Sequence, residues 1–239
     1  MNLHHLLEKR RAAGKPVRVA LIGAGKFGSM FLSQVPYTPG LEVSVIVDLD
    51  PERAREACRT VGWDAARIAA TTFTKDGIAA IGGDIEVVVE ATGNPAVGIR
   101  HARAAIAAGK HIVMVNVEAD VLAGPLLAEE ARKVGVVYSL AYGDQPALTA
   151  EMVDWARATG FKVVAAGKGT KYLPIYHDVT PAGVWGHYGL TAAEAQSAGM
   201  NPQMFNSFLD GTKSAIEMAA IANATGLDVP SGGLLLPPC

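Results

Sequence analysis

The sequence predicts an α/β fold, a Rossmann-type doubly wound parallel sheet followed by a second, smaller α+β domain. Three observations predict it. The apolar run over 17–22 leads directly into a Gly-x-Gly-x-x-Gly turn, typical of the first strand and helix of such a fold. Apolar runs then alternate with helical patterns as far as Leu140, as a parallel sheet requires. Beyond Tyr142 the chain becomes richer in Gly, Pro, Tyr and His, which indicates a second unit.

The glycine turn predicts a dinucleotide site. Gly23 permits the tight turn, Gly25 lets the backbone approach a pyrophosphate, and Gly28 lets the new helix pack on the strand. Lys26 and Phe27 lie between the last two glycines, at a helix N-terminus whose unpaired N–H groups would face the phosphates. The alternative is a doubly wound fold whose glycines form only a turn, with no dinucleotide.

An acidic residue at the end of the second apolar run bears on the choice of cofactor. The run ends in Asp48, twenty residues beyond Gly28, where a carboxylate accepts hydrogen bonds from an adenosine ribose. This spacing favours NAD. Arg53 and Arg55 follow closely and suit the 2′-phosphate of NADP, although both also fit the first turns of a helix that starts at Pro51. Both cofactors therefore remain open.

The next elements extend the nucleotide-binding half. A helix is predicted over 51–61, and a polar stretch then leads to a buried strand over 84–93 that we expect to be the fourth. This strand ends in Ala91, Thr92 and Gly93, small residues that suit a strand passing under the nicotinamide ribose. The alternative is an ordinary exit from a strand into a turn.

The remaining elements follow the same alternation. They are a helix over 95–108, a strand over 111–116, a helix to Val134, a strand over 135–140, a helix over 145–159, a strand over 161–166 and a helix over about 202–225. We expect a cofactor-binding domain over 1–141 and a substrate domain over 142–239, with the reaction in the cleft between them. The tail after Pro230 has the pattern of a turn into an unfinished apolar run, so the second domain is expected to be truncated.

Composition narrows the function classes. The 239 residues are half apolar, carry a formal net charge of −2 and contain no basic or acidic block, so neither nucleic acid nor a membrane surface is an expected partner. The 2 cysteines and 6 histidines show no spacing typical of a disulfide framework or a zinc site. No targeting signal or membrane span is visible. We expect a cytoplasmic homo-oligomer that acts on a small molecule.

The last predicted helix carries a polar stripe. Winding it at about 100° per residue places Asn206, Asp210, Lys213 and Glu217 within about 60° of one another, with apolar residues elsewhere. Such a stripe faces either a cleft or water. In a cleft it would hold substrate, whereas on a solvated face Lys213 and Glu217 would form an ion pair worth about 0.2–0.5 kcal/mol.

A second lysine adds to the candidates. Lys168 follows the predicted strand over 161–166 and lies between two glycines, where it either approaches an anion closely or is an ordinary surface lysine. Two lysines that met near one substrate would each release a proton more easily, because like charges oppose each other.

Carboxylates follow two of the predicted strands. Glu118 and Asp120 come after the strand that ends in Asn116, which we expect to stop beside the nicotinamide, and Asp144 comes after the next strand. Carboxylates at these positions would orient substrate hydroxyls or hold a divalent cation through oxygen ligands. Asp120 fits a helix cap equally well.

The chain resembles the homoserine dehydrogenase superfamily. The resemblance lies in the nucleotide fold, in a Gly-Lys turn into an Asn-ended strand over 109–116, and in a late helix that bears Lys213. Members of that superfamily carry a lysine directly after the asparagine and an aspartate four residues before the helix lysine. Here these positions are Val117 and Leu209, with Asp210 one residue later. These departures point away from an ordinary homoserine dehydrogenase.

The chain is more similar to the reductoisomerase-like branch of that superfamily, whose members convert 1-deoxy-D-xylulose 5-phosphate on the way to isoprenoids. The shared phrases are N-V-E-A-D at 116–120, A-G-K-G at 166–169, D-G-T-K at 210–213 and E-M-A-A-I-A-N-A-T-G-L at 217–227. The resemblance spans nearly the whole chain and implies an NADPH-dependent reductoisomerase. Members of the family continue further at the C-terminus.

Together the motifs predict an NAD(P)-dependent oxidoreductase that transfers a hydride between the nicotinamide and a small polar hydroxy or keto substrate, best a sugar phosphate. Two alternatives are a simple hydroxy-acid, amino-acid or polyol dehydrogenase that needs no metal, and a cofactor-binding or regulatory protein without catalysis. The expected catalytic residues are Lys213, Lys168, Asp210 and Glu118, and the expected substrate ligands are Asp144, Asn206 and Glu217.

Overall fold

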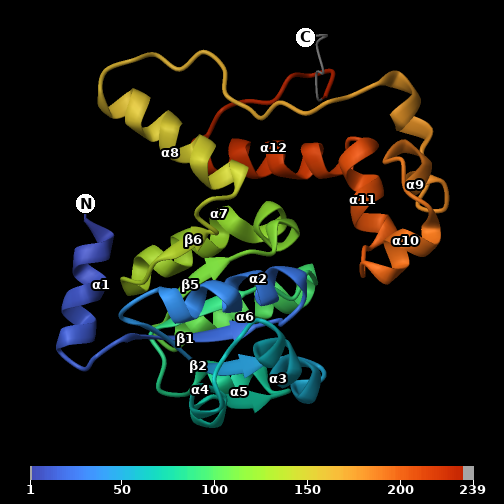
Figure 1. Ribbon diagram of the computed structural model, residues 1–239. Helices are drawn as coiled ribbons and strands as arrows, with labels where there is room; N and C mark the ends of the chain where they lie inside the picture. The colour runs from blue at the N-terminus through green and yellow to red at the C-terminus, as the bar shows by residue number, and fades with distance from the viewer. Residues whose placement is uncertain (1, 234–239) are drawn as a thin grey trace. The chain divides into compact units, whose positions relative to one another are not determined.

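The computed structural model describes residues 2–233, which fold as two compact units (Figure 1). The first unit comprises residues 1–142 and the second residues 143–239. Each unit is described by itself below.

Unit 1 is built on six parallel strands in the order β3-β2-β1-β4-β5-β6. The chain starts at the centre of the sheet, runs outward to β3, returns to the centre and then runs outward on the other side. This is the order of a doubly wound nucleotide-binding fold, so the predicted fold class is confirmed, and the strand expected to be the fourth is β4. The strands are β1 Val17–Ile22, β2 Leu41–Val47, β3 Thr72–Thr74, β4 Val87–Glu90, β5 His111–Met114 and β6 Tyr138–Leu140.

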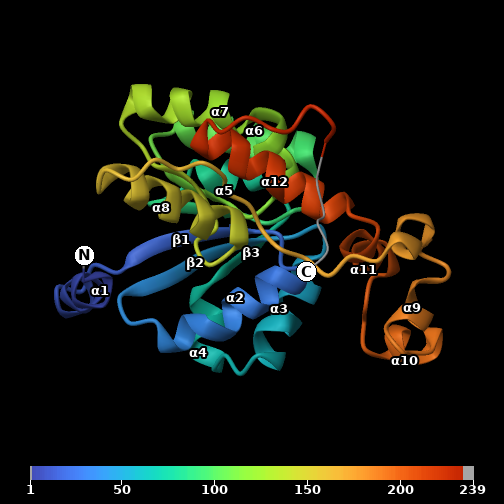
Figure 2. The same cartoon turned by 90° about the horizontal axis from the view of Figure 1, so that it is seen from above.

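Helices cover both faces of this sheet (Figure 2). The first face packs against α2 Lys26–Gln34, α3 Pro51–Thr60 and α4 Ala65–Ala70, and the second against α5 Gly77–Ile81, α6 Pro95–Ala107 and α7 Val117–Val134. Side chains of β1 alternate between the two cores, with Val19 and Leu21 in the first and Ala20 and Ile22 in the second. Because both faces are covered, β1 is apolar nearly throughout its length.

Short polar side chains fix where the helices of unit 1 begin. In each of α3 to α7 the N-cap side chain accepts a hydrogen bond from a backbone N–H of the first turn, which satisfies a group the helix itself leaves unpaired. The capping residues are Asp50, Asp64, Asp76, Asn94 and Asn116. The α2 helix differs, because its N-cap is Gly25, which has no side chain to occupy the first N–H groups.

Two parts of unit 1 depart from the sequence interpretation. The polar stretch after α3 contains α4, β3 and α5, which the periodicity did not reveal because β3 has only three residues and its first one is exposed. The N-terminal stretch forms α1 Leu3–Ala12, which buries none of its residues. Arg10 of α1 forms an ion pair with Glu86 just before β4 at 2.5 Å, which ties the helix to the sheet. A 3-10 turn, Val35–Tyr37, follows α2.

The secondary-structure elements in the described residues of unit 2 are all helices. Its elements are α8 Gln145–Ala158, the 3-10 helix Pro174–Asp178, α9 Val184–His187, α10 Ala192–Ser197, α11 Pro202–Leu209 and α12 Thr212–Thr225. A small core joins α9, α10 and α11 around Trp185 and Leu209, where the Trp185 and Phe205 ring centroids lie 5.3 Å apart. The α12 helix packs along α8 and buries Ala220 and Ile221.

The strand expected over 161–166 is not found. This segment is extended but pairs with no other strand among residues 143–233, and Val164 is largely exposed. The β-branched composition predicted a strand, but a strand needs a hydrogen-bonding neighbour, and the described part of unit 2 offers none. The α+β character expected of this unit is therefore not seen in its described residues.

The single helix expected over 202–225 is also corrected. It breaks at Asp210 and Gly211, and Gly211 has a φ of 87°, a left-handed conformation that ends one helix and turns the chain before the next. Asp210 accepts hydrogen bonds from the Thr212 N–H at 2.9 Å and from the Thr212 hydroxyl at 2.7 Å, which holds the turn closed. The four polar residues of the stripe therefore lie on two helices rather than one.

Candidate active site

The site in unit 1 is a cavity of about 620 Å³ at the carboxyl ends of the parallel strands. In open α/β sheets this edge, near the point where the strand order reverses, is where ligands bind. The lining comes from the ends of β1 and β2, the glycine turn, the segments after β3 and β4, the starts of α3 and α5, and the first half of α6. The lining residues are Ile22, Gly23, Gly25, Val47, Asp48, Leu49, Arg53, Lys75, Asp76, Gly77, Ile78, Ala91, Thr92, Asn94, Val97, Arg100 and His101.

Close backbone contacts account for two of the turn's glycines. A Cβ on Gly23 would lie 2.5 Å from the Ala91 carbonyl oxygen, so only glycine lets β1 and β4 approach at this edge. A Cβ on Gly28 would overlap the Gly23 carbonyl oxygen, which fits its expected role in packing α2 on the strand. A Cβ on Gly25 would meet nothing within 4 Å, because that position opens onto the cavity. The space beside Gly25 is therefore not filled by protein atoms.

Asp48 lies on the wall of this cavity, only 8% exposed. Its Oδ2 accepts from the Ala24 N–H at 2.9 Å, and its Oδ1 accepts from the Asp50 N–H at 3.0 Å and from Arg53 at 2.8 Å. Burial by itself would raise the pKa of Asp48, but these three donors outweigh it and hold the pKa below its ordinary value. A carboxylate offers about four acceptor positions, so one position, on Oδ2, remains for a ligand.

The sequence interpretation missed the part of the cavity that follows β3. Lys75, Asp76 and Gly77 line it, and a Cβ on Gly77 would lie 2.7 Å from Nε2 of His101 on α6. These residues were missed because β3 itself was not recognised. The Asp-Gly pair at 76–77, directly after a threonine-rich run, is the signal that would have revealed them.

A buried carboxylate supports the loop after β4. Glu90 is fully buried, and its Oε1 accepts from the Thr92 hydroxyl at 2.6 Å and lies 3.4 Å from Nδ1 of His101. Its other oxygen, Oε2, has no hydrogen-bond partner among the described residues. Ala91 and Thr92, two of the predicted cofactor-binding residues, both line the cavity. Through its hydrogen bond with Thr92, Glu90 therefore helps to fix this part of the lining.

Other predicted cofactor residues lie near the cavity without lining it. Among the described residues, the lining does not include Lys26, Phe27, Gly28, Gly93 or Asn116. Asn116 is 3% exposed, caps α7 and donates to the Asn94 carbonyl at 2.9 Å, so it joins the loops after β4 and β5.

The acids at the start of α7 have different surroundings. Glu118 is half-buried in the first turn. Asp120 does not cap the helix, because Asn116 does; it is 5% exposed and accepts from the Tyr138 hydroxyl at 2.8 Å. Burial raises the pKa of Asp120, and the hydrogen bond from Tyr138 offsets only part of that effect. Burial and the neighbouring Asp120 likewise raise the pKa of Tyr138.

Unit 2 brings together three of its predicted residues. Glu217 of α12 is 4% exposed and lies between two lysines. Lys168 donates to its Oε2, and Nζ of Lys213 lies 3.5 Å from its Oε1. The solvated-face interpretation is therefore wrong for Glu217, which is buried and shared by two cations.

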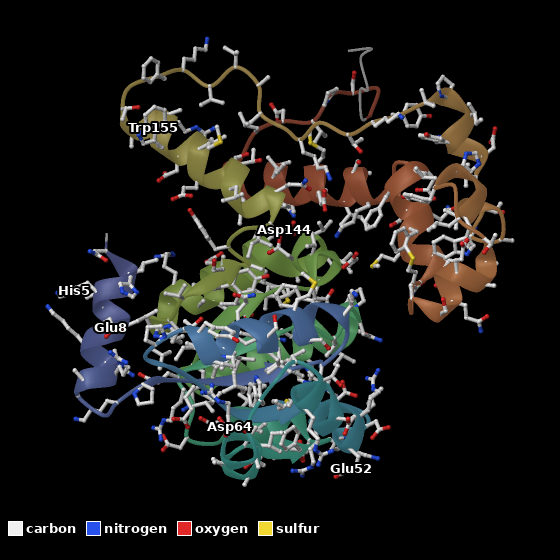
Figure 3. All side chains as sticks on the ribbon, in the orientation of Figure 1. His5, Glu8, Glu52, Asp64, Asp144 and Trp155 are labelled. Carbon is white, nitrogen blue, oxygen red and sulfur yellow. The ribbon has the colours of Figure 1, made fainter. Side chains whose placement is uncertain are left out.

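The other polar candidates of unit 2 form hydrogen bonds with residues close to them in the sequence. Asn206 is buried and donates to Oδ2 of Asp210 at 2.8 Å, while Oδ1 of Asn206 has no partner among the described residues. Asp210 holds the turn between α11 and α12, as described above. Asp144 stands at the start of α8 (Figure 3), where it accepts from the Gln145 N–H at 2.9 Å.

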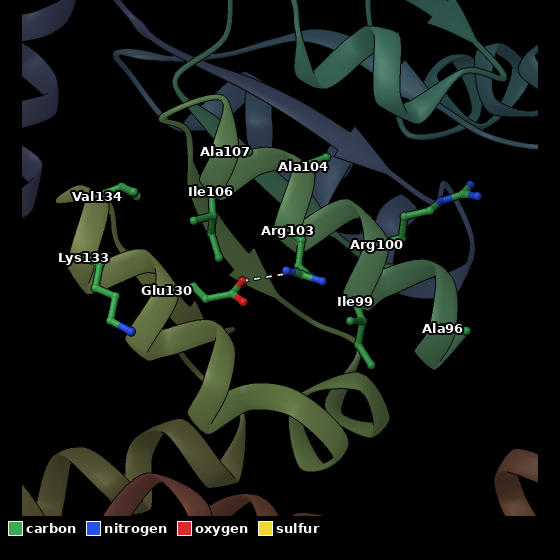
Figure 4. Close-up of a pocket in the computed structure, with 10 residues that line it drawn as sticks. All are labelled: Ala96, Ile99, Arg100, Arg103, Ala104, Ile106, Ala107, Glu130, Lys133 and Val134. Carbon is green, nitrogen blue, oxygen red and sulfur yellow. Dashed lines mark hydrogen bonds and ion pairs between the residues drawn. The ribbon is translucent and has the colours of Figure 1, made fainter.

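A second cavity, of about 780 Å³, lies between α6 and α7 on the outside of unit 1 (Figure 4). Six of its ten lining residues are apolar and four are charged, and Arg103 of α6 and Glu130 of α7 form an ion pair there at 3.3 Å. Over residues 2–233 no three His, Cys, Asp or Glu side chains gather as metal ligands would. In the same range no helix has both the length and the apolar character needed to cross a bilayer.

Two family models match the chain, one in each unit. Residues 17–118 match the oxidoreductase family with an NAD-binding Rossmann fold, and residues 143–239 match the oxidoreductase DRL catalytic domain. No curated protein matches the sequence significantly.

Solved structures of three dehydrogenases are similar to part of the chain. Homoserine dehydrogenase from Thiobacillus denitrificans has a TM-score of 0.48 at 19% identity, over 60% of this chain and 34% of its own. Levoglucosan dehydrogenase in complex with NADH has a TM-score of 0.46 at 26% identity, over 61% of this chain and 40% of its own. Scyllo-inositol dehydrogenase from Lactobacillus casei has a TM-score of 0.45 at 14% identity, over 60% and 42%. The chain thus spans less than half the length of these structures.

The two matched segments correspond to the two units. The glycine turn, Asp48 and the loop after β4 lie within the NAD-binding segment, and Lys168, Lys213 and Glu217 lie within the catalytic-domain segment. Each unit thus contains a segment that matches an oxidoreductase family model, the NAD-binding Rossmann fold in unit 1 and the oxidoreductase DRL catalytic domain in unit 2.

Proposed function

We propose that the protein uses NAD(H) to oxidise a carbinol carbon, or reduce a carbonyl carbon, of a small polar substrate. The observation that carries this proposal is the cavity of unit 1, with its glycine turn, its open position at Gly25 and its buried Asp48. Unit 1 is the cofactor domain in this proposal and unit 2 the substrate domain.

The surroundings of Asp48 support NAD(H) as the preferred cofactor. The remaining acceptor position on Oδ2 suits a ribose hydroxyl, which donates a hydrogen bond, and would repel a 2′-phosphate. Arg53 is 62% exposed and already pairs with Asp48, so it does not present an unpaired cation to a phosphate. The free N–H groups at the start of α2, beside Gly25, suit the pyrophosphate.

The lysines of unit 2 are our candidates for handling the substrate oxygen. When bound, NAD⁺ supplies the hydride acceptor, and the protein must then take up the hydroxyl proton or stabilise the charge that develops on oxygen. Lys213 and Lys168 carry ammonium groups that suit both tasks. Glu118, Asp144, Asp210 and Asn206 remain candidates for orienting substrate hydroxyls.

Turnover by a lysine variant tests this proposal. Purified protein is incubated with NAD⁺ and a panel of polyols and small hydroxy acids, and formation of NADH is followed by absorbance. We expect Lys213→Met to lower turnover on the best substrate by about 10²–10⁴-fold, the usual contribution of a positioned proton-transfer group, and to leave NADH affinity unchanged. Lys162→Met, at an exposed lysine of the same unit, is the matched control. Equal turnover in both variants would remove Lys213 from the proposal.

A second candidate is reductoisomerisation of a sugar phosphate with NADPH. It is favoured by the phrases at 166–169, 210–213 and 217–227, which resemble the reductoisomerase-like branch and lie within the catalytic-domain segment. That reaction would require a divalent cation, for which Glu118, Asp144 and Asp210 were the sequence candidates. Its test is consumption of NADPH with 1-deoxy-D-xylulose 5-phosphate in the presence of Mg²⁺. Turnover that stops with EDTA supports this candidate, and turnover that persists in EDTA supports a simple dehydrogenase.

A further inference from the structure

The two lysines around Glu217 are not equivalent, and this difference carries an inference that rests on the proposed function. Both contact the same buried carboxylate, one on each oxygen. Lys168 donates a hydrogen bond to Oε2, whereas Nζ of Lys213 lies 3.5 Å from Oε1, beyond the usual hydrogen-bond range of about 2.7–3.2 Å. The side chain of Lys168 is 13% exposed and that of Lys213 is 25% exposed.

The backbone around Lys168 is fixed against α12 as well. A Cβ on Gly167 would lie 2.8 Å from Cε of Met218, so the segment passes close to the Met218 side chain of α12. The Lys168 N–H points to the Met218 sulfur at 3.4 Å. Lys168 is therefore held at its backbone by Met218 and at its ammonium by Glu217. Lys213 stands in the first turn of α12 and reaches Glu217 only across one helical turn.

The elements packed against α12 carry four other charged groups. Asp210, at the end of α11, accepts from Asn206 and Thr212. On α8, Arg157 donates to the Thr225 carbonyl at the opposite end of α12, and Glu151 and Asp154 complete the charged residues on that helix. Glu217 is thus the carboxylate that the described contacts place on both lysines.

We propose that Glu217 is a positioning residue that gives the two lysines different roles. It holds Lys168 as a fixed ammonium next to the substrate oxygen and leaves Lys213 as the amine that exchanges the substrate's proton. In the oxidation, NAD⁺ would, when bound, supply the acceptor for the hydride, which carries the two electrons of the carbinol C–H bond. The hydroxyl proton passes to the neutral amine of Lys213, and a C=O bond forms. Lys213 then releases that proton to water, and reduction follows the same path in reverse.

Competitive labelling of lysines tests the division without any substrate or cofactor. Intact protein is treated with a trace of acetic anhydride over a series of pH values, and the label on each lysine is measured by peptide mass spectrometry. Only the neutral amine reacts, so the midpoint of labelling reports when each lysine loses its proton. In the wild type we expect Lys213 to be labelled at least several-fold faster than Lys168. Equal labelling of the two would overturn the proposal.

Two variants then test whether the charge of Glu217 controls the reactivity of the lysines. A purely structural role for Glu217 would not change that reactivity. Glu217→Gln removes the negative charge, so at the same pH Lys213 should be labelled several-fold faster than in the wild type, and Lys168 should become reactive. Lys168→Met removes the neighbouring positive charge, so Lys213 should be labelled several-fold more slowly than in the wild type. Unchanged labelling of Lys213 in both variants, or changes in the same direction, would contradict the proposal.

Matched controls separate charge from damage to the fold. Glu194→Gln and Lys162→Met change the same residue types elsewhere in unit 2, and we expect both to leave the labelling of Lys213 unchanged. If Glu217→Gln fails to fold by circular dichroism, the wild-type labelling order and Lys168→Met still decide the question. A negative labelling result would overturn only the roles assigned to the two lysines. The proposed function is tested separately, by NADH formation and by the turnover of Lys213→Met.

Discussion

Gly28 shows how closely the α2 helix must approach the β1 strand. A Cβ at this position would overlap the Gly23 carbonyl oxygen, which belongs to the backbone and cannot move aside cheaply. We predict that Gly28→Ala lowers the free energy of unfolding by about 1–3 kcal/mol, the usual cost of overpacking, and also weakens NADH binding. Denaturant unfolding measures the first effect and fluorescence titration the second. A variant as stable as the wild type would show that the turn has more room than the structure gives it.

Asp48 tests the choice between the two nicotinamide cofactors. Asp48→Asn keeps the shape of the side chain but removes its charge, so the hydrogen bond expected from a ribose hydroxyl should weaken. We predict that NADH affinity falls by about 10- to 100-fold, the loss expected for a hydrogen bond to a charged group, and that NADPH affinity falls less or rises. Titration with each cofactor measures this. Asp64→Asn, at the N-cap of α4, is the control and should bind as the wild type does.

At the scale of elements, the break between α11 and α12 depends on one backbone conformation. Gly211 has a φ of 87°, which costs a residue with a Cβ about 1–2 kcal/mol. We predict that Gly211→Ala lowers the free energy of unfolding by that amount. Gly186→Ala is the matched control, because its φ is not positive and a Cβ there would meet nothing within 4 Å. Equal stability of the two variants would argue that the two helices join into one when the glycine is replaced.

The contact between α7 and β6 predicts a particular dependence of stability on pH. Burial raises the pKa of Asp120 above the 3.8 of an unfolded chain, so the folded protein binds more protons in the window just above that value. Stability from this group is therefore lost as pH rises through the window. Between about pH 4 and pH 7, we predict that the free energy of unfolding falls less with rising pH in Asp120→Asn than in the wild type.

Denaturant unfolding at a series of pH values measures this difference. Asp76→Asn, an exposed helix cap of the same unit, is the control and should keep the wild-type slope. The same slope in Asp120→Asn as in the wild type would mean that the carboxylate is not effectively buried.

For the whole molecule, the parts of the fold that the sequence predicted are those with strong local signals. The glycine turn and the apolar strands β1, β2 and β4 each have a clear local pattern, so most of the sheet of unit 1 follows from them. The missed β3 has three residues, too few for a periodic signal. The helix break at Gly211 was overlooked because a continuous apolar pattern hid the Asp-Gly turn.

Residues with a local sequence pattern were proposed from the sequence, and residues that meet only through the fold were missed. Gly23, Gly25 and Asp48 were proposed from spacing alone, and all three line the cavity. His101 comes from the middle of α6 and meets Gly77 only through the fold, which no local pattern encodes. The pairing of Lys168 with Glu217 likewise joins residues 49 positions apart, so the sequence identified both residues without their contact.

The central claim is that the open space beside Gly25 holds the dinucleotide. The most direct measurement is fluorescence titration with NADH of the wild type and of Gly25→Ala, together with their unfolding free energies. A Cβ at Gly25 meets no protein atom within 4 Å, and its φ of −72° suits alanine, so we predict unchanged stability. Because that Cβ would enter the cavity, we predict that NADH affinity falls at least about tenfold, or roughly 1.4 kcal/mol. If Gly25→Ala is as stable as the wild type and binds NADH equally well, the cofactor does not occupy this cavity.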